Sequence, residues 1–209
     1  MRLAHTQDYG ALRAPTPEDP WRVLLSGCLA GWRCGVDGTD YEMGGAQGAF
    51  FASPLAVALP FCPELVGLGA TRTLPDLHGG DGRALLRGEA KALDQHGADL
   101  TEGMLAGARA MLAFARERAV DFAILTDMSG ACGTQVISLG CRFDEPRRYQ
   151  QGLGVAAALL DEAGFVVSQR DHRTLARLRA RIDPGFPPDP AALDHHQHPW
   201  TIETFGPTP

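Results

Sequence analysis

VLLSGC, residues 23–28, is a short apolar run that stops at a glycine and a cysteine. Such a run is typical of a buried strand in a parallel sheet. Two more apolar runs of this 209-residue chain end alike: residues 55–61 lead into Cys62, and residues 122–125 lead through a short loop to Cys132. Parallel strands end along one edge of an open sheet, and ligands bind at that edge. We therefore expect the three thiols to lie in one crevice.

Helical patterns separate the predicted strands. Residues 101–119 place apolar side chains near the 3.6-residue period, and residues 152–164 form a second such segment that ends at a glycine. A last strand is expected at residues 166–168, and a weaker one at residues 136–139. This alternation predicts an α/β fold, a single Rossmann-like domain of three αβα layers around a mostly parallel sheet.

Composition divides the chain into three parts. Residues 1–20 are a polar, proline-punctuated lead-in, residues 21–170 form the α/β domain, and residues 171–209 form a C-terminal helical and extended extension. The extension begins with a basic amphipathic helix at residues 171–181, whose arginines we expect to face solvent or a partner. Within the domain, the glycine-rich residues 65–83 predict a long irregular loop.

The bulk composition is that of a globular protein, with 44% hydrophobic and 21% charged residues. A net charge of −6 argues against a general nucleic-acid or membrane-surface binder. No apolar stretch reaches the roughly 18 residues that span a bilayer, and the N-terminus lacks an apolar signal-peptide segment. We therefore expect a cytoplasmic protein. Thiols stay reduced there, so five cysteines indicate a metal or catalytic site rather than disulfides.

Glycines surround the first of the cysteine motifs. Cys28 and Cys34 lie in a loop with four glycines, which let the backbone approach a ligand closely. The same loop continues to a short helix that we expect near residues 46–52. Cys141 has no matching motif and is interpreted as a free structural thiol.

The other two cysteines each have a polar neighbour. Glu64 follows Cys62 by two residues and could move a proton in the same cleft. Ser129 precedes Cys132 by three residues, in a loop of small side chains. These two residues are the candidates for catalytic groups beside the thiols.

The residues alone leave three kinds of site open. Three thiolates suit a metal or an iron–sulfur cluster, and Cys34 would complete a closed four-cysteine zinc module. The paired cysteine knuckles of a structural zinc site are absent, however. Cys132 could instead be the nucleophile of a sulfurtransferase, although no histidine lies near it in sequence. The histidines at positions 195, 196 and 198 are expected to be part of a solvated tail.

Taken together, the motifs resemble those of the thiouracil desulfidase (2-thiouracil desulfurase) family over roughly residues 22–169. The matching segments, in the order of that family, are SGCLAG with CGVDG, PFCPE with the following Gly and Thr-Arg, GGDG, GADLT, FAILTDMSGACG and GVAAALL. Two departures stand out. Thr126-Asp127 replaces a Lys-Glu pair, and the SGAC of residues 129–132 replaces Ser-Pro-Ser-Cys.

The resemblance implies a 4Fe-4S cluster held by Cys28, Cys62 and Cys132, with one iron left open. An open, thiophilic iron would take the sulfur of a thiolated, thiouracil-like nucleobase. Water would then replace that sulfur, leaving the oxo base and sulfide without net electron transfer. The implied protein is an enzyme whose partner is a small-molecule thiolated base. The net charge of −6 favours such a small, neutral substrate over a nucleic acid.

The resemblance also implies roles for residues around the cluster. Glu64 would relay protons, and Ser129 would hydrogen-bond the substrate or the tetrahedral intermediate. Contacts to the substrate are expected from Cys34, Asp37 and Arg72.

Overall fold

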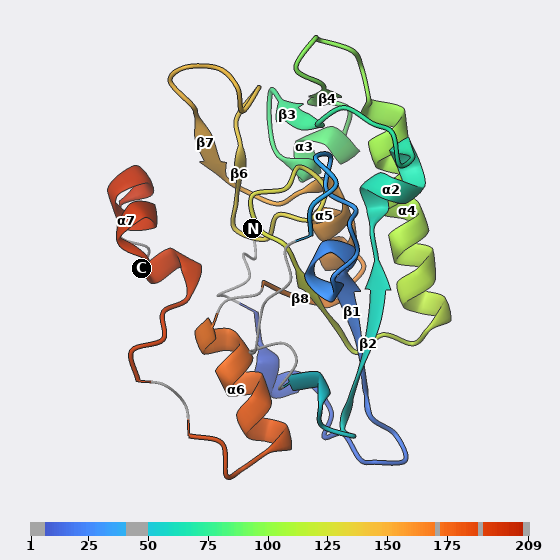
Figure 1. Ribbon diagram of the computed structural model, residues 1–209, viewed down its shortest axis with the longest axis vertical. Helices are drawn as coiled ribbons and strands as arrows, with labels where there is room; N and C mark the ends of the chain where they lie inside the picture. The colour runs from blue at the N-terminus through green and yellow to red at the C-terminus, as the bar shows by residue number, and fades with distance from the viewer. Residues whose placement is uncertain (1–6, 41–49, 170–171, 188–189, 207–209) are drawn as a thin grey trace.

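A four-stranded, wholly parallel sheet forms the centre of the computed structural model, which describes residues 7–40, 50–169, 172–187 and 190–206 (Figure 1). In spatial order its strands are β2 (Ala56–Phe61), β1 (Trp21–Ser26), β5 (Phe122–Leu125) and β8 (Val166–Gln169). β1 lies between β2 and β5, so the three strands that precede the cysteines are neighbours. The predicted parallel α/β sheet is confirmed.

Pro60 lies inside β2, although a proline is expected to end a strand. It pairs in register with Leu25 of β1. A proline is tolerated because β2 is an edge strand, with a partner strand on one side only.

Four helices of the central region pack into the core on one face of the sheet. They are α2 (Pro63–Leu68), α3 (Gly82–Leu86), α4 (Thr101–Glu117) and α5 (Val155–Glu162). The backbones of α2 and α4 touch: a Cβ added to Gly107 would lie 2.0 Å from the carbonyl oxygen of Pro63, and one added to Gly67 would lie 2.0 Å from that of Gly103. Glycine at these positions therefore holds α2, which begins directly after Cys62, tightly against α4.

The opposite face of the sheet is covered by α6 (His172–Ile182), which lies away from α4 in Figure 1. Its apolar stripe of Leu175, Leu178 and Ile182 is buried against Trp21 and Phe122 of the sheet. The predicted three-layer architecture is confirmed, and the first helix of the predicted extension supplies its third layer. The apolar stripe of α6 does not by itself indicate which surface it covers, so the sequence alone placed this helix in a separate extension.

The basic side chains of α6 do more than face solvent. Arg181 donates to the carbonyl oxygens of Tyr9 and Leu12 and lies over the ring of Trp21, 5.0 Å from its centroid. The arginine thus ties the N-terminal lead-in to the third layer.

The expected irregular loop at residues 65–83 is interrupted by short regular elements. It contains the end of α2, the strand β3 (Asp76–His78) and the start of α3. β3 forms an antiparallel hairpin with β4 (Lys91–Leu93), and Asp81 caps α3 by accepting hydrogen bonds from two backbone N–H groups. Strands of three residues are too short to show a periodic pattern of apolar side chains in the sequence.

The weak strand predicted at residues 136–139 exists, but outside the main sheet. β6 (Val136–Ser138) pairs antiparallel with β7 (Tyr149–Gln151) in a hairpin. The remaining elements are the short helices η2 (Tyr9–Ala11), η3 (Gly27–Ala30) and η4 (His195–Gln197), and the helix α7 (Pro199–Phe205). Most of the helix expected near residues 46–52 lies outside the described residues. Among those described, no helix is long and apolar enough to cross a membrane.

Candidate active site

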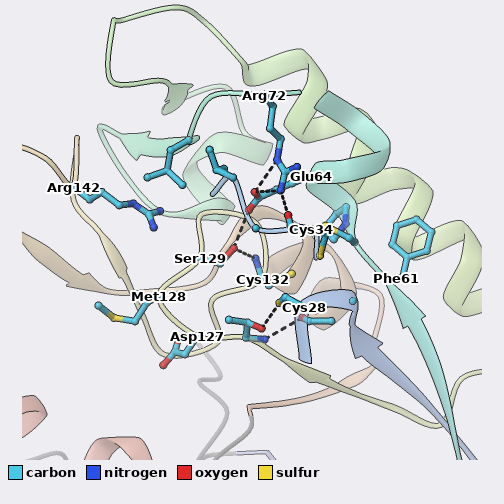
Figure 2. Close-up of a pocket in the computed structure, with 18 residues that line it drawn as sticks. Cys28, Cys34, Phe61, Glu64, Arg72, Asp127, Met128, Ser129, Cys132 and Arg142 are labelled. Carbon is cyan, nitrogen blue, oxygen red and sulfur yellow. Dashed lines mark hydrogen bonds and ion pairs between the residues drawn. The ribbon is translucent and has the colours of Figure 1, made fainter. Parts of the chain in front are cut away.

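Four cysteines line one cavity of about 230 Å³ at the carboxyl ends of β1, β2 and β5 (Figure 2). Cys28 follows β1 in η3, Cys62 follows β2 directly, and Cys132 lies in the loop after β5. Cys34 reaches the cavity from the glycine-rich loop, and every one of the four thiols is free. The structure therefore brings together the three cysteines that the sequence predicted to meet at this edge.

The loop that carries Cys132 is held by two side chains. Ser129 Oγ accepts hydrogen bonds from the backbone N–H of Ala131 (3.2 Å) and of Cys132 (3.1 Å). Asp127 Oδ1 accepts from three successive N–H groups, those of Thr134, Gln135 and Val136, at 3.0–3.1 Å. The loop is thus fixed at both ends, and with it the position of the Cys132 sulfur.

Glu64 faces the same cavity from the first turn of α2. Ser129 Oγ donates to Glu64 Oε1 (3.1 Å), while Arg72 Nε and Nη2 donate to Glu64 Oε2 (3.3 and 3.2 Å). Figure 2 shows these groups as one connected chain above the thiols. The geometry places a carboxylate and a hydroxyl, both able to exchange protons, beside the cysteines.

Arg72 lies at the cavity wall with its donors already in use. Besides Glu64, its guanidinium donates to the carbonyl oxygens of Cys34 and Gly69, and its side chain is only 3% exposed. An arginine so bound fits the positioning of Glu64 and of the Cys34 loop better than contact with a substrate.

The four thiols differ in how readily they lose a proton. Interaction with the Cys34 thiol lowers the pKa of Cys28, with a further contribution from Thr126. The same interaction, aided by the Leu65 N–H, lowers the pKa of Cys62 to about 7. The pKa of Cys34 is raised in turn, and burial raises the pKa of Cys132. Of these three neighbouring thiols, Cys34 is therefore the one that keeps its proton most readily.

Asp37 is the predicted site residue that the structure does not bring to the cavity wall. Its carboxylate accepts a hydrogen bond from the Thr39 N–H (3.0 Å), and the Gly35 N–H donates to the Thr39 carbonyl oxygen (2.9 Å). Asp37 therefore caps a local turn, which the sequence pattern could not distinguish from a ligand contact. Cys141 likewise does not line the cavity.

Four polar residues of the cavity lining were not among the predicted site residues: Ser26, Thr126, Asp127 and Arg142. Thr126 directly follows β5, so the rule that located the cysteines would also have located it. Arg142 comes from the loop after β6, which carries no such signal. It is held by the buried Asp76, whose carboxylate accepts from its Nε and its backbone N–H at 2.8 Å each.

The cavity cysteines suit one kind of metal group better than another. Within the described part of the chain, no group of three or more His, Cys, Asp or Glu side chains is arranged to hold a metal ion. A zinc ion needs its sulfur ligands about 2.3 Å from one point, so a closed zinc module gains no support. A multinuclear cluster binds each cysteine sulfur at a different iron, and three cysteines that line one cavity from the ends of three different strands suit that requirement.

The chain is similar in sequence and in structure to known proteins. The profile of the 2-thiouracil desulfurase family matches residues 23–172. The uncharacterized protein YbbK of Bacillus subtilis (strain 168) is 33% identical over 151 residues, which are 71% of this chain and 96% of YbbK. A solved structure described as the 4Fe-4S-dependent thiouracil desulfidase TudS is similar with a TM-score of 0.61 at 27% identity, over 76% of this chain and 96% of that chain. The chain belongs to the 2-thiouracil desulfurase family.

Proposed function

We propose that this enzyme removes sulfur from a thiolated nucleobase of the thiouracil kind, giving the oxo base and sulfide without net electron transfer. The observation that carries the proposal is one cavity lined by Cys28, Cys62, Cys132, Glu64 and Ser129. Membership of the family and similarity to a structure described as 4Fe-4S-dependent support it.

Cys28, Cys62 and Cys132 would hold a 4Fe-4S cluster and leave one iron without a protein ligand. When bound, such a cluster supplies a thiophilic Lewis acid for the sulfur of the substrate. Cys34, whose thiol keeps its proton beside Cys28 and Cys62, would face the substrate side of the cavity.

Glu64 would act as the general base. Its Oε1 would accept a proton from the water that attacks the thiocarbonyl carbon, and the same carboxyl would return that proton as sulfide leaves. Arg72 keeps the carboxylate oriented through two hydrogen bonds to the other oxygen. Overall, water supplies the oxygen of the new carbonyl group and the protons of the sulfide product.

Ser129 would stabilise charge that develops on the substrate. Its oxygen already accepts two backbone hydrogen bonds, so its one proton is the group it can offer. The hydroxyl group donates this proton in a hydrogen bond to Glu64. It would donate to the tetrahedral intermediate instead once substrate is bound.

The need for reduced thiols and the net charge of the chain indicate the cellular compartment and the kind of substrate. We propose a cytoplasmic enzyme, because reduced thiols are required. A free base or another small molecule fits a chain of net charge −6 better than a nucleic acid does.

The nucleophile alternative has less support from the geometry. Burial raises the pKa of Cys132, whereas a nucleophilic cysteine needs a lowered one. No histidine lies among the described residues that line the cavity.

Anaerobic reconstitution with iron and sulfide tests the proposal. We expect about four iron and four sulfide per chain, and release of sulfide from 2-thiouracil or 4-thiouracil. Cys62→Ala should abolish both, while the matched control Cys141→Ala should keep both, since Cys141 lies outside the cavity lining.

Three other results of this experiment would each contradict one part of the proposal. A Cys62→Ala protein with full cluster and activity would remove Cys62 from the ligand set. Zinc without iron in anaerobic protein would favour the structural module. Activity of metal-free protein, lost on alkylation of Cys132, would favour the sulfurtransferase.

A further inference from the structure

Thr126 lies at the end of β5 with its hydroxyl turned to a cavity cysteine. Its Oγ1 is 2.9 Å from Cys28 Sγ, and the residue is only 8% exposed. The two residues are 98 positions apart in sequence, so the contact exists only because β1 and β5 are neighbouring strands.

The direction of this hydrogen bond follows from the state of the sulfur. In the thiol form either group could donate. A cysteine that ligates iron is a thiolate and has no proton, so Thr126 would then be the donor.

A second hydrogen bond fixes the backbone of Thr126, and with it the position of the hydroxyl group next to Cys28. Its N–H donates to Ser26 Oγ at 3.1 Å, and Ser26 is the 1%-exposed last residue of β1. The Ser26 hydroxyl, with its oxygen occupied as an acceptor, interacts with the Cys132 thiol. Two buried hydroxyl groups thus link the strand ends to two of the proposed ligand sulfurs.

We propose that Thr126 is a positioning residue that donates a hydrogen bond to the Cys28 sulfur while that sulfur ligates the cluster. The inference rests on the proposed function. A donor at a ligand sulfur draws negative charge from the cluster, which raises its reduction potential. Partners that orient a metal ligand also slow the loss of the metal, and removing one costs about 10- to 100-fold in affinity or activity.

Two substitutions separate the hydrogen bond from the packing. Thr126→Val keeps the shape of the side chain and removes the hydroxyl, whereas Thr126→Ser removes only the methyl group. Thr134→Val is the matched control: Thr134 is a buried threonine of the neighbouring loop that does not line the cavity, and its hydroxyl has no hydrogen-bond partner in the described structure.

The experiment uses the full chain, reconstituted anaerobically. The reduction potential is measured by spectroscopic titration, and loss of iron is followed with a ferrous chelator. We expect Thr126→Val to have a lower potential and about tenfold faster iron release, with Thr126→Ser and Thr134→Val near the wild type.

The outcomes separate this inference from the function on which it rests. A wild-type chain that takes up no cluster would overturn both. If the wild type is loaded and active but Thr126→Val matches it in potential and iron release, the inference fails and the proposed function stands. Thr126→Ser behaving like Thr126→Val would also overturn it, because the hydroxyl would then not be responsible.

Discussion

The two ends of the central sheet use polar side chains in opposite ways. At the amino end, Asp121 accepts from Arg13 Nε (2.6 Å), Arg13 Nη2 (2.9 Å) and the Arg22 N–H (2.7 Å). The indole of Trp21 donates to the Arg13 carbonyl oxygen at 2.9 Å. At the carboxyl end, the thiols instead meet one another and two hydroxyl groups around a cavity.

This difference suggests a division between stability and function. The charged groups at the amino end are hydrogen-bonded to one another within the protein, and these bonds attach residues 7–20 to the sheet. The thiols at the carboxyl end have weaker partners, which a bound ligand can replace. Substitutions at the carboxyl end should therefore reduce activity, and substitutions at the amino end should reduce the free energy of unfolding.

The largest effect is expected from Glu64→Gln. The amide oxygen can still accept from Arg72, but the group can no longer take a proton, so sulfide release should fall about 10²- to 10⁴-fold. Iron content should stay at the wild-type level. The control is Glu102→Gln on the exposed side of α4, and a loss below tenfold in the loaded variant would remove Glu64 as the base.

Gly107→Ala should lower both the free energy of unfolding and the activity. The new methyl group would meet the Pro63 carbonyl oxygen and push α2, which carries Glu64, away from α4. Overpacking of this kind costs about 3 kcal/mol in urea unfolding, and activity should fall with it. Gly185→Ala, in an exposed loop, is the control. Wild-type stability for Gly107→Ala would show that the contact of α2 with α4 can relax.

Asp121→Ala should lower stability and leave activity unchanged, the opposite of what is expected for Glu64→Gln. It leaves Arg13 and the Arg22 N–H without their acceptor, which should lower the free energy of unfolding by about 2 kcal/mol. Specific activity of the folded protein should not change. Asp144→Ala, at an exposed aspartate, is the stability control. A loss of activity without loss of stability would break the comparison between the two ends.

The smallest effect is expected at Asp99, which belongs to neither end. Hydrogen bonds from Thr101 and Lys91 lower the pKa of Asp99 to about 2. Its pKa in the unfolded chain is near 3.9, so the stabilisation is complete above that pH and is lost as the pH falls towards 2. Asp99→Asn should slightly lower the Tm near pH 7, with a difference that narrows below pH 4. A difference that grows in acid would contradict this assignment.

The strands of the main sheet could be predicted because each contains a short apolar run, and the cysteines because each follows such a run. The hairpin of β3 and β4 could not, since three-residue strands among glycines have no periodic pattern. The packing of α6 on the sheet was missed for another reason. Its stripe was visible in sequence, but the surface that it covers is formed by residues such as Trp21, about 150 positions away.

By itself, the sequence determined the chemistry of the site: which side chains are thiols, carboxylates and hydroxyls, and which of them follow a strand. Only the tertiary structure decided which of these groups touch. Ser129 reaches Glu64 across 65 positions, and Thr126 reaches Cys28 across 98. Both contacts depend on the order β2-β1-β5 in the sheet, and that order results from the packing of the whole core rather than from any local pattern.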